Sequence, residues 1–104
     1  MIADVHGALC SALVGLFHPA RAEIRSSSQR RWSSVTFSGA RHRCELSISG
    51  EGANALVDHA TAAVMGEDFA FEGHVVADIA VMDRRSPSRD RVEIEFEALT
   101  VEAN

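Results

Sequence analysis

The sequence contains 104 residues, of which 46% are apolar and 24% charged, and its formal net charge is −5. This size and composition are typical of one globular domain and exclude a largely disordered chain. The acidic balance argues against coating nucleic acid or an anionic membrane, because such binding needs a surplus of positive charge. All ten basic residues are arginines, a usage common where genomes are GC-rich, which favours a bacterial source.

The first segment, from Ile2 to Phe17, carries apolar residues at helical spacing and has a weak polar face. Asp4 and His6 stand where a signal peptide would be basic, and the segment is shorter than the ~20 residues that span a bilayer. We therefore interpret it as a helix of the fold that ends before Pro19, and we expect a cytoplasmic protein with no membrane partner.

Three strands are predicted next. Residues 20–25 alternate between apolar and charged, which is typical of a half-buried strand, and the polar run 26–31 is predicted to be a loop. Residues 32–37 are predicted as a second strand with Val35 and Phe37 pointing inward. After a turn at Gly39, a third strand is expected to place His42 and Cys44 on its apolar face.

A second helix is predicted between Gly52 and Gly66, and Phe69 and Phe71 lead into a strand centred on residues 74–81. Residues 83–90 are predicted to form a long loop before the last strand, in which Phe96 points inward and the glutamates at 93, 95 and 97 outward. The order is helix, two or three strands, helix, two strands. It predicts a single α+β domain over residues 1–104, a two-layer sandwich with two helices on one face of a mostly antiparallel sheet of four or five strands.

Cys10 and Cys44 both continue apolar stripes, and the sequence has no CxxC motif. Free cysteine in such a stripe behaves as a small hydrophobe. We predict two buried free thiols in a reducing compartment.

A candidate pocket is formed by His42, His74 and Asp78. His74 and Asp78 are predicted to share a strand face about 13 Å apart, too far for a hydrogen bond, so a site would need neighbouring strands. A small ligand-binding or catalytic domain using these residues is one hypothesis, and burial of the histidines as structural residues is the alternative that we favour. No catalytic residue is assigned, and an enzyme is less favoured than a non-enzymatic protein.

No cofactor or metal is predicted. The spacing of His42, Cys44 and His59 matches no zinc pattern, and there is no phosphate-binding glycine loop, Gly-x-Ser-x-Gly or HExxH motif. Arginine-rich segments at 30–31 and 84–91 could contact nucleic acid, but the net charge argues against that partner.

The strand at 74–81 is apolar on both faces, although two helices can cover only one face of the sheet. We therefore predict a self-association surface that includes Val76 and Ala80 of this strand with Val14 and Phe17 of the first helix. The leading hypothesis is a non-enzymatic assembly domain that forms a homodimer or a larger homo-oligomer, with any other protein partner unknown.

Residues 32–102, about two thirds of the chain, contain a strand RHRCELSIS, a helix GANALVDHATAAVM, a segment F-x-F-x-G-H and a closing strand pair. This layout, behind an N-terminal helix, resembles the tail-terminator and head–tail joining proteins of phages and gene-transfer agents. The chain is shorter than those proteins between its first helix and third strand. The resemblance implies a tail component that acts in a ring of subunits.

Overall fold

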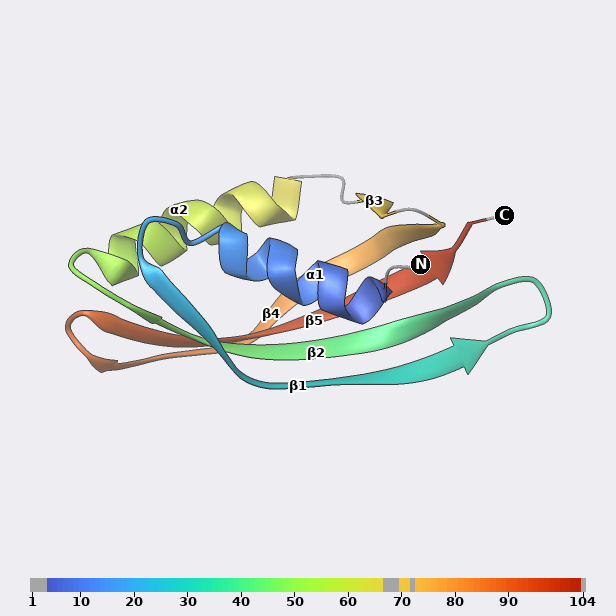
Figure 1. Cartoon of the computed structure of the whole chain (residues 1–104), viewed down its shortest axis with the longest axis horizontal. Coiled ribbons are helices and arrows are strands. Elements are labelled where there is room, and N and C mark those ends of the chain that lie inside the picture. The colour runs from blue at the N-terminus through green and yellow to red at the C-terminus, as the bar shows by residue number, and fades with distance from the viewer. Residues whose placement is uncertain (1–3, 67–69, 72, 104) are drawn as a thin grey trace.

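A computed structural model describes residues 4–66, 70–71 and 73–103. Its elements, in chain order, are α1 (Val5–Gly15), β1 (Arg21–Ser33), β2 (Ser38–Ser49), α2 (Ala53–Gly66), β3 (Ala70–Phe71), β4 (His74–Ser88) and β5 (Arg91–Glu102). The strands form one antiparallel sheet in the order β1-β2-β5-β4-β3, and both helices lie on the same face of it (Figure 1). This confirms the predicted two-layer α+β fold.

Ile2 and Phe69, which the sequence placed in the first helix and before the fourth strand, lie outside the described residues. Within the described part of the chain, no helix is long and apolar enough to cross a membrane.

The inner face of the sheet, the one beneath the helices, is built from alternate residues of β2 and β5. On β5 these residues are all buried, and they are Val92, Ile94, Phe96, Ala98 and Thr100. The ring of Phe17, at the end of the first helical segment, packs 6.3 Å from the ring of Phe96, centroid to centroid. The glutamates at 93, 95 and 97 lie on the opposite, outer face, as predicted.

The serine-rich run 26–31 is a strand, and the prediction of a loop there was wrong. β1 extends from Arg21 to Ser33, with one register shift at Arg25, because pairing with β2 satisfies the backbone groups on that side of the strand, whatever the side-chain preference of serine. The predicted strand 32–37 ends early. At its end the hydroxyl of Ser34 accepts a hydrogen bond from the backbone N–H of Phe37, which closes a turn at residues 34–37.

The predicted loop at 83–90 was also wrong, because β4 continues to Ser88 and only Arg89 and Asp90 form the turn. The charged residues of this run find partners across the sheet and on the helix layer. The guanidinium of Arg84, for example, pairs with the carboxylate of Asp58 in α2. Ion pairs of this kind allow a charged sequence to extend a strand that its composition would otherwise assign to solvent.

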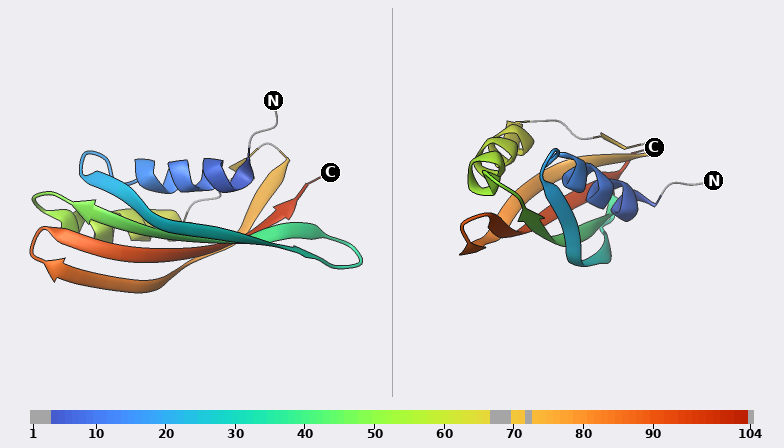
Figure 2. Two further views of the ribbon diagram at one scale, coloured as in Figure 1. Left: turned by 60° about the horizontal axis from the view of Figure 1, so that its bottom comes forward. Right: turned by 60° about the vertical axis from the view of Figure 1, so that its left-hand side comes forward.

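Two long hairpins, β1–β2 and β4–β5, give the molecule an elongated shape of 47 × 26 × 19 Å. The end of the β1–β2 hairpin projects beyond the helical layer, as Figures 1 and 2 show. The turn at 34–37 therefore stands away from the core.

Phe96→Ala is expected to lower the free energy of unfolding by about 3–5 kcal/mol, because removing a buried aromatic side chain leaves a cavity. Glu95→Ala, on the outer face of the same strand, should cost about 1 kcal/mol or less, because its partner Arg43 is held at the surface. Denaturant unfolding of both variants measures the difference. Reversed magnitudes would mean that the strand register is shifted by one residue.

Candidate functional site

The structure does not bring His42, His74 and Asp78 together on one face. β4 has an irregularity after Val76, where Val76 pairs with Thr100 but Asp78 pairs with Leu99, so Ala77 is an extra residue. An inserted residue reverses the alternation of side chains. His74 stays with the inner face, and Asp78 moves to the outer face. The predicted common face of His74 and Asp78 depended on an unbroken strand.

His42 instead belongs to a hydrogen-bonded chain that joins α1 to the sheet. Its Nδ1 lies 2.9 Å from Nδ1 of His6, and the two rings are nearly parallel, with an interplanar angle of 14°. Its Nε2 lies 2.8 Å from the hydroxyl of Thr100, which in turn donates to the carbonyl of Ala40. Nε2 of His6 lies 3.8 Å from the sulfur of Cys10.

One assignment of protons satisfies this whole chain with both histidines neutral. Cys10 donates to His6, the Nδ1–H of His6 donates to His42, and the Nε2–H of His42 donates to Thr100. A proton added to His42 would place two N–H donors face to face. His42 is also 1% exposed. Burial, reinforced by the positive charge that His6 can carry, lowers the pKa of His42 below its ordinary value.

Stability is therefore expected to depend on pH through His42. Because its pKa is lower in the folded chain than the 6.5 of a free side chain, unfolding takes up a proton as pH falls below that value. The free energy of unfolding should keep its full value above pH 7 and fall as the pH drops below 6.5, by at most about 1.4 kcal/mol per pH unit for one proton. Urea unfolding at a series of pH values measures this slope.

His42→Leu should flatten the slope while lowering stability at pH 7.5, because Thr100 and His6 lose their partner. His59→Gln, on an exposed position of α2, is the matched control and should keep the wild-type slope. An unchanged slope in His42→Leu would contradict the assignment.

Cys10 and Cys44 are free and buried, as predicted. Burial, together with the neighbouring Cys10 thiol, raises the pKa of Cys44 to about 12. A thiol with this pKa carries almost no thiolate at neutral pH, so Cys44 is not suited to act as a nucleophile.

A thiol reagent such as 5,5′-dithiobis(2-nitrobenzoate) is expected to modify neither cysteine of the folded protein at pH 7.5 within minutes. In denaturant, two thiols per chain should react at once, because the thiolate then forms at its ordinary pKa. The Thr36→Cys variant is the positive control, since a thiol introduced at this exposed position should react without denaturant. Rapid modification of Cys44 in the folded protein would contradict its burial.

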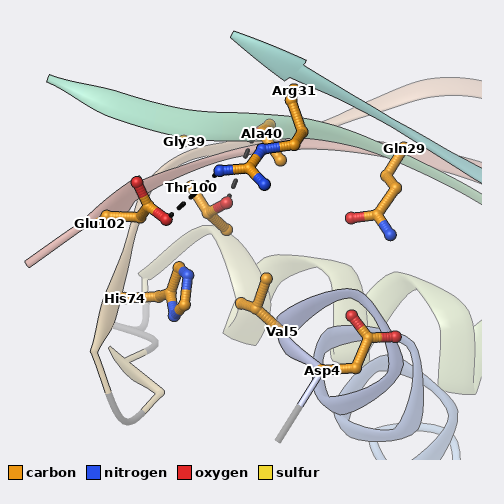
Figure 3. Close-up of a pocket in the computed structure, with 9 residues that line it drawn as sticks. All are labelled: Asp4, Val5, Gln29, Arg31, Gly39, Ala40, His74, Thr100 and Glu102. Carbon is orange, nitrogen blue, oxygen red and sulfur yellow. Dashed lines mark hydrogen bonds and ion pairs between the residues drawn. The ribbon is translucent and has the colours of Figure 1, made fainter. Parts of the chain in front are cut away.

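A cavity of about 370 Å³ lies beside the N-terminal end of α1, as Figure 3 shows. His74 lines it, but His42 and Asp78 do not. Two of its charged residues, Arg31 and Glu102, form an ion pair of 3.8 Å across it. Asp4 uses its carboxylate to accept hydrogen bonds from the first backbone N–H groups of α1. Asp4 is thus engaged in capping α1, and Arg31 and Glu102 are paired with each other.

No group of three or more His, Cys, Asp or Glu side chains in the described ranges is arranged to hold a metal ion. In the His6–His42 contact the two Nδ1 atoms point at each other, so they hydrogen-bond to each other and do not face a common ligand.

The four residues predicted to form a self-association surface do not share a face. Phe17 is completely buried, and Val14 and Val76 pack against the core of this same chain. Ala80 pairs with Glu97 and therefore lies on the outer face. The extra residue at Ala77 places Val76 and Ala80 on opposite faces of the sheet, so these four residues do not form one exposed surface.

Large apolar side chains are exposed at the turn of the β1–β2 hairpin. Val35 is fully exposed and Phe37 is 56% exposed, at the end that projects beyond the helices. The sequence signal was present, but the alternation of Val35 and Phe37 is typical of a strand, and it led to the prediction that both point inward.

The outer face carries rows of opposite charge on the two central strands. Arg41 and Arg43 of β2 pair with Glu97 and Glu95 of β5, and the second pair is bidentate. These contacts fix the register of β2 against β5 from the solvent side. They make this face a polar surface over the middle of the sheet.

The fold is similar to that of a chain in the solved structure described as "Virion of native gene transfer agent (GTA) particle". The TM-score is 0.58 and the sequence identity 18%, and the match covers 92% of this chain and 86% of that chain. At this identity the likeness shows a shared fold. No protein-family model and no curated protein matches the sequence.

Proposed function

We propose that this protein is a non-enzymatic, self-associating structural component of a phage-like or gene-transfer-agent-like particle, at a tail-terminator or head–tail joining position. The observation that carries the proposal is the fold shared with a chain of a gene-transfer-agent virion over nearly the whole length of both chains. Subunits of such a particle work by contact with other subunits, and a small domain with no assembled catalytic group in its described residues fits that task.

The projecting hairpin turn supplies the contact in this proposal. Val35 and Phe37 expose large apolar surface at residues 34–37, where the chain's own core cannot reach them. Apolar surface removed from water stabilises an association by roughly 25 cal/mol per Å² before the entropy of association is counted. A neighbouring copy that covers this turn would bury both side chains.

The alternative of a small ligand-binding or catalytic domain receives less support. Asp78 lies on the face opposite His42 and His74, and His42 is enclosed by its hydrogen-bonded neighbours. General acid–base work needs such groups to reach one substrate.

The protein is expected to form a homo-oligomer at micromolar concentration, seen by light scattering and as closed rings by negative-stain electron microscopy. Phe37→Glu should shift it to a monomer, because the interface would then contain an unpaired charge. Met82→Glu is the matched control, since Met82 is similarly exposed, at 54%, but lies on β4.

A wild-type monomer at high micromolar concentration would contradict self-association. An oligomer that Phe37→Glu leaves intact and Met82→Glu breaks would place the contact on β4 and would contradict the hairpin turn as the interface.

A further inference from the structure

The outer edge of β1, the side turned away from β2, is long and regular, and no strand of the described chain pairs with it. β1 is the outermost strand on its side of the sheet. After a register shift between Ile24 and Ser26, the eight residues from Ser26 to Ser33 pair with β2 without a break. The other side of this segment therefore presents a row of backbone N–H and C=O groups that another strand can pair with.

The opposite edge of the sheet is built differently. β3 pairs with only the first two residues of β4, and the rest of β4 contains three register shifts and Pro87. Bulges and proline are the devices by which an edge strand avoids pairing with another chain. β1 has neither in its last eight residues.

The β1 edge is also basic, although the chain as a whole is acidic. Residues 21–33 contain four arginines and one glutamate, a formal charge of 4 − 1 = +3 in a chain of −5. Arg30 of β1 lies directly opposite Arg41 of β2. Arg41 is paired with Glu97, whereas Arg30 forms no ion pair with any residue that the structure describes.

Like charges directly across a strand pair are destabilising. A carboxylate placed beside Arg30 would relieve this repulsion, and a strand added outside β1 can bring one to that position on the sheet. The hollow of about 390 Å³ that Arg30 lines with Arg41, Ser28 and Glu97 leaves room for such a side chain.

Trp32 places an apolar side chain next to Arg30 on the β1 edge. It is two residues beyond Arg30 and so shares the outer face with it. Its partner Gly39 has no side chain, and a Cβ built there would lie 3.1 Å from the Cε2 atom of the Trp32 indole. The indole thus packs against the backbone of β2 at Gly39, with its Nε1 buried, and its apolar ring is partly exposed at the edge.

We propose that the edge of β1 binds an extended acidic segment of a partner protein as an additional strand, with a carboxylate beside Arg30 and an apolar side chain beside Trp32. Backbone hydrogen bonds supply the general attraction in this mode of binding, and alternate side chains supply its specificity. This inference does not rest on the proposed function, since the hairpin turn at 34–37 and the edge at 26–33 are separate surfaces.

A second copy of this chain is the less suitable occupant. Pairing β1 with another β1 would bring Arg25, Arg30 and Arg31 of each copy into one seam. Charged side chains on an edge act against self-pairing. The same arginines favour an acidic strand.

The test uses two blocked peptides, TVTETVT and TVTKTVT, which differ only in the charge of the central residue. We expect the glutamate peptide to bind at least ten-fold more tightly than the lysine peptide in a calorimetric or fluorescence titration at low salt, and the difference to shrink as salt is added. Hydrogen exchange should show new protection at alternate amides of residues 26–33.

Arg30→Glu should reverse the preference, so that the lysine peptide binds more tightly, and it should not unfold the exposed strand. Arg89→Glu, in the turn between β4 and β5, makes the same change of charge elsewhere and should leave the preference unaltered.

Equal affinities for the two peptides, a preference unaffected by Arg30→Glu, or β1 amides that stay unprotected at millimolar peptide would each overturn the proposal. So would protection of these amides that rises with protein concentration in the absence of peptide, because a second copy would then occupy the edge. None of these results depends on whether Phe37→Glu dissociates an oligomer, so this inference and the proposed function can fail independently.

Discussion

The packing of two helices against a single face of the sheet is the interaction on which the rest of the structure depends. It requires every second residue of β2 and β5 to be apolar or internally satisfied, and it fixes the register, since a shift of one residue would expose the whole core. It also explains why His42 is not a surface histidine. A polar ring on the buried face must find partners there, and His6 and Thr100 provide them.

The same constraint divides the chemistry of the sheet between its faces. Between the helices and the sheet the core holds neutral groups, including the thiols of Cys10 and Cys44 and the rings of His6 and His42, which share a hydrogen bond. The outer face of β2 and β5 carries charges that pair across the strands and contribute modestly to stability. The surfaces that we propose for binding, the projecting turn and the β1 edge, lie in parts of the chain that the core does not use.

Much of the fold could be predicted from the sequence wherever one residue period dominates. The alternation around Phe96 and the apolar stripe around Val57 and Val64 identified a strand and a helix, because their partners lie on one side only. The serine run of β1 could not be identified in this way. An edge strand that is exposed on both faces has no hydrophobic alternation. Its pairing with β2 uses backbone groups, so its side-chain composition does not reveal the strand.

The candidate site was predicted less well, for a related reason. One extra residue at Ala77 changes the face of Asp78, and a bulge has no clear signature in a run of small apolar residues. The burial of His42 was predictable from its strand. Its contact with His6 was not, because it depends on how α1 docks against a strand 36 residues away in sequence.

The pairing of β2 with β5 joins two halves that each consist of a helix and a hairpin. At one end of this β2–β5 seam Ser49 lies opposite Arg91, and the backbone N–H of Gly50 donates to the carbonyl of Asp90. The chain between residues 50 and 90 thus forms a closed loop. Each hairpin can form from neighbours in sequence, whereas the seam must bring together residues separated by the whole of α2 and β4. Closing that loop costs chain entropy before any contact compensates for it. From this topology we expect the meeting of the two halves to be the slow event of folding and each helix–hairpin half to form before it.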